Sequence, residues 1–223
     1  MPDAMIDAGS DGPTIDSMCG TKKLLTGELV DWDSTNGADD FCGVFGATFT
    51  VHGTPSETAM TAPNGRYLLC ADDAPQIRVD ITMPTDPSPC AAAPGTYMIP
   101  GIAYFPQAVV ADGAMFSARA ITAERAAVFF SEMEGGFGVT YDPTKPQLFV
   151  HVNGGSALVD TDADHDTALT FNGTIWSGGN TGTDLYFPNL SSTQVQLGSS
   201  PVADGDAAYI MEPGVFTYIT ISL

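Results

Sequence analysis

The sequence predicts an all-β protein made of two β-sandwich modules, with one short helix between them. Glycine and proline are abundant (24 and 16 residues), which is typical of a fold with many turns. Hydrophobic residues make up 43% of the 223 residues and charged residues only 15%, as in a folded protein. Short segments alternate apolar and polar side chains, the pattern of strands with one buried face.

The first third of the chain holds four predicted strands. In Ala47–Val51 apolar residues alternate with threonines, so one face of the strand is apolar and the other polar. Asn64-Gly65 supplies the positive φ angles that a tight reversal needs. The four predicted strands are Leu25–Asp31, Ala47–Val51, Gly65–Leu69 and Gln76–Ile81.

Three motifs of this region resemble the carboxypeptidase regulatory-like domain, also called the prealbumin-like or CnaB-like domain. They are G-E-L-V-D at 27–31, G-A-T-F-T-V at 46–51 and T-A-P-N-G-R-Y-L-L at 61–69. The matching positions are Gly27, Val30, Gly46, Ala47, Val51, Thr61, Gly65 and Tyr67, within residues 22–84. The resemblance implies an immunoglobulin/prealbumin-like sandwich. It implies little about activity, because such modules serve as scaffolds, spacers and binding units.

All four cysteines lie in the first ninety residues, and their spacing contains no C-x-x-C pair, which argues against a zinc site. An even number within one β module predicts two disulfides and an oxidising compartment. Three pairings are open. We favour Cys42–Cys70 inside the module and Cys19–Cys90 across its ends.

The formal net charge of −20 excludes several kinds of partner. Only seven Lys and Arg residues are present, and none follows Lys145, so nucleic acid and anionic membranes are disfavoured. Cations, or neutral polymers such as glycans, suit this surface better. The plainer interpretation is that acidity keeps a secreted protein soluble.

Residues 1–18 carry four aspartates and no basic residue, which predicts a flexible acidic leader. This segment resembles the Asp/Ala-rich tethers that follow the lipidated cysteine in surface lipoproteins of myxobacteria. No secretory signal and no apolar run of transmembrane length is visible. The predicted disulfides and the resemblance to surface tethers together predict an extracellular or cell-surface location. This prediction includes a lipoprotein whose anchor is absent from this chain.

The Pro-rich stretch 83–96 predicts a domain boundary. The predicted organisation is a leader (1–18), a disulfide-stabilised sandwich (19–90), a connecting region (91–145) and a second sandwich (146–223). The connecting region holds the predicted helix at 122–134, with Thr122 as N-cap and Gly135-Gly136 as its end. The strands predicted for the second sandwich are 148–152, 157–159, 168–171, 185–187, 195–197 and 215–223.

The sharpest local motif is an acidic loop with carboxylates at alternate positions, Asp160, Asp162, Asp164 and Asp166. Such carboxylates can converge on calcium, which takes six to eight oxygen ligands. The loop is not an EF-hand, because His165 and Phe171 stand where that motif has glycine and glutamate. A calcium site and a merely solvated loop are the two alternatives.

Trp32 and Trp176 lie in polar, Gly-rich surroundings. Exposed aromatic rings on a sandwich can stack on sugars, whereas buried ones fill its core. No G-x-S-x-G, H-E-x-x-H or Gly-rich phosphate motif occurs, so we predict that the chain is not an enzyme.

Together these features predict a non-catalytic extracellular structural or adhesive module, stabilised by calcium and able to self-assemble through its strand edges. The alternative is a carbohydrate-binding module, and the third interpretation is an accessory domain of an acidic hydrolase.

Overall fold

The computed structural model describes residues 19–32, 42–85, 97–98, 101–106, 116–200 and 208–223. The predicted leader and Cys90 lie outside these residues. Within them the chain is mostly β, with one helix, and no helix is long and apolar enough to cross a membrane.

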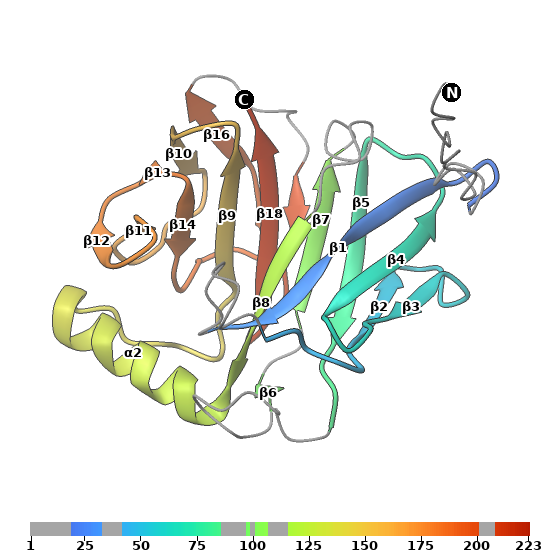
Figure 1. The fold of residues 1–223 in the computed structure, drawn as a ribbon. Helices are drawn as coiled ribbons and strands as arrows, with labels where there is room; N and C mark the ends of the chain where they lie inside the picture. Colours follow the sequence, from blue (N-terminus) through green and yellow to red (C-terminus); the bar gives the residue numbers. More distant parts are fainter. Residues whose placement is uncertain (1–18, 33–41, 86–96, 99–100, 107–115, 201–207) are drawn as a thin grey trace, which may run out of the picture.

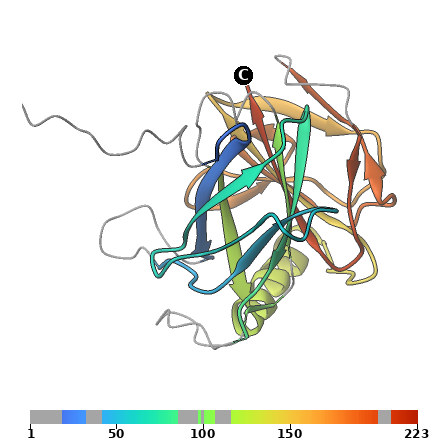
Figure 2. The same ribbon diagram turned by 90° about the vertical axis from the view of Figure 1, so that its right-hand side faces the viewer.

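The strands form three layers (Figures 1 and 2). The middle layer is a nine-stranded sheet in the order β12-β11-β14-β9-β18-β7-β5-β2-β3. A four-stranded sheet, β4-β1-β8-β6, packs on one face. A three-stranded sheet, β13-β10-β16, and the pair β15-β17 lie on the other face.

The strands of the nine-stranded sheet, in its spatial order, are β12 (Trp176–Gly178), β11 (Leu169–Phe171), β14 (Asp184–Phe187), β9 (Gln147–Asn153), β18 (Phe216–Ser222), β7 (Gly101–Pro106), β5 (Gln76–Thr82), β2 (Thr48–Val51) and β3 (Thr58–Met60). The other strands are β4 (Arg66–Ala71), β1 (Lys23–Asp31), β8 (Phe116–Thr122), β6 (Tyr97–Met98), β13 (Thr181–Gly182), β10 (Ala157–Thr161), β16 (Leu197–Ser200), β15 (Gln194–Val195) and β17 (Tyr209–Ile210).

Strand β7 shows why the middle layer is buried on both faces. Ala103 and Phe105 belong to the core on the side of the four-stranded sheet. Ile102 and Tyr104 belong to the core on the side of the three-stranded sheet. A strand that faces two cores needs apolar side chains at successive positions, so it lacks the alternation that marks a strand with one buried face.

Two separate sandwich modules are not confirmed. The C-terminal strand β18 lies between β9 and β7 and is parallel to both. It thereby joins the strands of the two predicted modules into one continuous sheet. The region predicted as a connection (91–145) also contributes β8, which pairs with β1, so strand pairing crosses the predicted boundary.

The helix α2 (Ala123–Phe137) begins as predicted, since the side chain of Thr122 accepts a hydrogen bond from Arg125 N at 3.3 Å. Its predicted end was wrong. The helix continues through both glycines, and Gly138, at φ 70°, ends it. Glycine inside a helix costs only about 1 kcal/mol, and Phe137, at the last position, packs against the core.

The favoured cysteine pairing was also wrong. Cys19 is bonded to Cys70, with their Cα atoms 5.4 Å apart. The antiparallel pairing of β1 with β4 places Leu24 opposite Cys70, and a turn closed by Lys22 N and Cys19 O (3.1 Å) brings Cys19 back toward it. Cys42 is disulfide-bonded as well, and no described cysteine is free.

Candidate functional site

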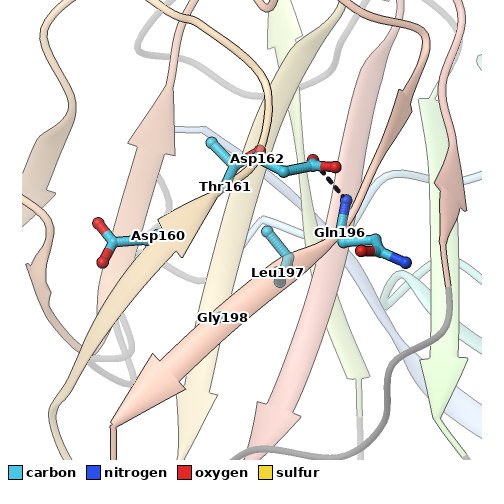
Figure 3. Close-up of a pocket in the computed structure, with 6 residues that line it drawn as sticks. All are labelled: Asp160, Thr161, Asp162, Gln196, Leu197 and Gly198. Atoms are coloured by element: carbon cyan, nitrogen blue, oxygen red, sulfur yellow. Dashed lines mark hydrogen bonds between the residues drawn. The ribbon is translucent and has the colours of Figure 1, made fainter.

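The acidic loop leaves the end of β10 and borders a shallow, open depression of about 380 Å³. Its lining consists of Asp160, Thr161, Asp162, Gln196, Leu197 and Gly198. Asp160 and Asp162 point away from each other across this lining (Figure 3). The two carboxylates nearest to the depression therefore do not face a common point.

Each of three carboxylates in the loop has its own hydrogen-bond donor. Asn180 Nδ2 donates to Asp160, Gln196 N donates to Asp162 Oδ1 at 2.7 Å, and Asn189 Nδ2 donates to Asp166 Oδ2 at 2.7 Å. The fourth carboxylate, Asp164, is exposed. Among the described residues no group of three or more His, Cys, Asp or Glu side chains could hold a metal ion. Asp160 and Asp162 do not converge on one point here, and calcium binding stays a prediction.

The two tryptophans meet in one aromatic cluster. Trp32, just after β1, lies 4.9 Å from Phe129 of α2 and 5.6 Å from Phe149 of β9, between ring centroids. Trp176, at the start of β12, lies 5.8 Å and 6.5 Å from the same two rings. Both indoles are only partly buried. They therefore contribute to the core and also present part of their surface to solvent.

Trp176 begins a row of side chains that crosses five neighbouring strands. In register, Phe171 lies opposite both Trp176 and Asp184, Asp184 lies opposite His151, and His151 lies opposite Thr220. Residues directly opposite each other share one face of a sheet. We call the first four of these residues, Trp176, Phe171, Asp184 and His151, the binding row.

The neighbouring row lies beside the binding row on the same face of the sheet and consists of large rings. Tyr186, Phe149 and Tyr218 lie opposite one another on β14, β9 and β18. Phe149 is stacked on Tyr186 at 4.5 Å and on Tyr218 at 5.6 Å. Helix α2 adds Phe129, which contacts Tyr186 at 5.8 Å. The helix lies below this end of the sheet in Figure 1.

Asp184 is the charged group of the binding row. His151 Nδ1 lies 2.8 Å from its Oδ1, and Thr183 Oγ1 donates to its Oδ2 at 3.2 Å. Burial opposes ionisation of Asp184, but the hydrogen bond and charge of His151 outweigh burial and hold the pKa of this carboxyl below its usual range. The positive charge of Arg119 acts in the same direction. Arg119 Nη1, on β8, also donates at 2.8 Å to Trp32 O, which directly follows the neighbouring strand β1 of the same sheet.

Burial raises the pKa of several tyrosines, among them Tyr67, Tyr186 and Tyr218. Tyr186 donates to Gln147 Oε1 at 2.6 Å, and Tyr218 donates to Arg119 O at 2.5 Å. The Tyr67 hydroxyl has no hydrogen-bond partner in the described part of the chain.

Sequence reasoning found the two tryptophans but missed Asp184 and Arg119. Alternation along β9 does place His151 on the same side as Phe149 and opposite Val150 and Val152. The partner of His151 depends on the pairing of β9 with β14, and no local pattern encodes that pairing.

Neither a protein-family model nor a curated protein matches the sequence. Among solved structures, the chain is similar to the Bacillus anthracis TIE protein, with 11% identity and a TM-score of 0.30. The similarity covers 91% of this chain and 34% of that chain, so this chain spans about a third of its length. A likeness this distant carries no argument about family or function. The resemblance to the carboxypeptidase regulatory-like domain stays a prediction.

Proposed function

We propose that this chain is a non-catalytic structural module of an extracellular surface. The observation that supports this proposal best is the place of β18 in the middle of the nine-stranded sheet. It pairs with β9 from Phe216 to Ser222 and with β7 from Phe216 to Ile219, in parallel on both sides.

This placement suits a module that carries tension. When a strand is pulled along its own axis, the hydrogen bonds on both its sides are loaded together and resist together. A strand at a sheet edge, pulled sideways, loses its bonds one after another. Forced unfolding is governed by the barrier to unfolding, which a simultaneously loaded ladder raises.

The disulfide supports both the location and the role. A Cys19–Cys70 bond is typical of an oxidising, extracellular environment. It also ties the chain covalently at the point where it enters β1, so β1 cannot separate from β4 at that end.

Pulling single molecules from two directions tests the proposal. Handles at Lys145, just before β9, and at Leu223, just after β18, pull these parallel strands in opposite directions along their axis. Handles at Gly20 and Gly173, in the β11–β12 turn, load the sheet edge instead. We expect a higher unfolding force for the first geometry. Equal forces in the two geometries would contradict a load-bearing role.

Self-assembly and calcium binding are the accompanying proposals, and they share one measurement. Support for assembly comes from the end strands of the nine-stranded sheet, β3 and β12, whose three residues each carry backbone groups that a second chain could pair with. Light scattering in calcium and in chelator checks both proposals. A calcium-dependent rise in molecular mass supports both proposals, and an unchanged mass contradicts assembly.

A further inference from the structure

We propose that the binding row, together with Trp32, is a binding site for a neutral polysaccharide. The proposal does not depend on the structural role above, because it rests on a different region of the sheet. It is carried by the side chains that strand pairing brings together and by their exposure to solvent.

The binding row is open to solvent although it adjoins a core. The side chains of His151 and Asp184 are 53% and 48% exposed. Trp176 and Trp32 are only partly buried. At the other end of the sheet, by contrast, the stacked rings of Phe49 and Tyr67 are 0% and 2% exposed. The aromatic rings of the binding row are therefore not sealed as rings that serve only the core are.

The row combines the two chemistries that a sugar ring requires. Trp176 and Phe171, whose rings lie 5.1 Å apart, offer apolar faces to the C–H groups of a pyranose. Asp184 follows directly in the row, and each of its oxygens keeps a lone pair that can accept a hydrogen bond from a sugar hydroxyl. Aromatic and hydrogen-bonding groups thus stand side by side on one face.

The polar end of the row is held in place before any ligand arrives. A carboxylate only accepts hydrogen bonds, so His151 Nδ1 carries the proton in its contact with Asp184. The second ring nitrogen, Nε2, can hydrogen-bond a sugar hydroxyl whether it donates or accepts, because a hydroxyl does both. Thr183 holds the other oxygen of Asp184. Fixing these groups in advance lowers the entropy that binding would otherwise cost.

Length and charge indicate the kind of sugar. The row spans four adjacent strands, and strands lie about 4.8 Å apart, so Trp176 and His151 are separated by about 14 Å along the sheet. That length accommodates more than one pyranose ring. A net charge of −20 and the ionised Asp184 disfavour anionic polymers, which leaves neutral ones.

Intrinsic fluorescence is a direct probe, because the only two tryptophans of the chain both belong to the proposed site. The folded full chain is titrated with a soluble β-glucan, a mannan, a xylan and a galactan, with polygalacturonate as the anionic control. Electrophoresis in gels that contain the same polymers gives an independent reading. We expect at least one neutral polymer to change the emission and retard the protein, and polygalacturonate to do neither. If none of the four neutral polymers does so, the proposal is wrong.

Matched variants separate the site from the rest of the surface. His151→Ala and Asp184→Asn should weaken retardation at least about tenfold, since each removes a hydrogen bond that involves a charged group. The control is His52→Ala. Its imidazole contacts Asp80 at the same 2.8 Å and is 55% exposed, but it has no tryptophan beside it. Circular dichroism verifies that each variant is folded.

Two results with these variants would overturn the proposal. One is equal loss of binding in His52→Ala and His151→Ala. The other is a concentration-dependent doubling of mass in the wild type that His151→Ala abolishes, because that result assigns the row to a second copy of this chain.

Discussion

The two ends of the nine-stranded sheet carry the same polar pair in different surroundings. His52 and Asp80 face away from the core that holds Phe49, and Arg78 and Glu212 extend their contacts into an ion-pair network. His151 and Asp184 have the same 2.8 Å contact but lie on the core side of the sheet, next to aromatic rings. The comparison teaches that the face on which a pair falls, more than its own geometry, decides what it can contact.

The covering layer explains this difference. At the β5-β2-β3 end, the strand β4 packs over β2, and Tyr67 closes on Phe49. At the β12-β11-β14 end, helix α2 covers the sheet through Phe129, and the row beyond that ring stays accessible. One end of the sheet is therefore a closed core and the other is a partly open surface.

The largest expected effect comes from Phe129→Ala, which should lower the free energy of unfolding by about 3–5 kcal/mol. Phe129 is fully buried and contacts Trp32, Trp176 and Tyr186. Its loss should also shift the emission of both tryptophans. Phe49→Ala, at the other end of the sheet, should lower the free energy of unfolding by about the same amount. It should leave the tryptophan emission unchanged. Chemical denaturation followed by fluorescence measures both quantities, and an emission shift in Phe49→Ala would break the comparison.

A smaller effect, spread over both ends, is expected at high pH. Tyr67, Tyr186 and Tyr218 have pKa values raised by burial, so they keep their protons in the folded state when the unfolded chain has lost them. The folded state then binds more protons, and stability falls as pH rises above about 10, by about 1.4 kcal/mol per buried phenol and pH unit.

Phenolate absorbance during a pH titration checks this expectation. These three tyrosines should ionise only as the protein unfolds, so phenolate absorbance should rise over the same pH range in which structure is lost. Ionisation of all tyrosines in a single step near pH 10, while the fold is intact, would contradict it.

The smallest expected effect concerns Asp184. Its pKa is held below the usual range, so its contribution to stability is present above the unfolded pKa of about 3.9 and is lost as pH falls through the folded value. Asp184→Asn should remove under about 1 kcal/mol at neutral pH, because the exposed half of the side chain is screened by solvent.

Thermal unfolding of the wild type, Asp184→Asn and the control Asp80→Asn measures this loss of stability. The pH runs from 2 to 7, about 2–3 units either side of the carboxyl pKa. A pH dependence for Asp184→Asn identical to that of the wild type would show that Asp184 contributes nothing.

Much of the fold could be predicted from local patterns. The alternation in Gln76–Ile81 matches β5, and the apolar residues Ile77, Val79 and Ile81 are all buried. Thr122 starts the helix as expected, because an N-cap satisfies backbone N–H groups within its own first turn. Such features depend on neighbours a few residues away, which the sequence displays directly.

The candidate site could be predicted only in part. Trp32 and Trp176 were recognised by type, yet nothing local shows that both would contact Phe129 and Phe149. The acidic loop had the spacing of a cation site, but its carboxylates bond Asn180, Gln196 and Asn189. The contacts of both tryptophans and of the loop carboxylates depend on side chains that are distant in the sequence and meet only in the folded chain.

The sequence by itself determined a β-rich chain, most strand positions, the start of the helix and a strongly acidic surface. Only the tertiary structure decided the order of the strands, the Cys19–Cys70 bond and the pairing of His151 with Asp184. The physical reason is that alternation specifies which face of a strand is buried, whereas backbone hydrogen bonds are the same for every residue. The choice of neighbouring strand is therefore made by the packing of the whole chain.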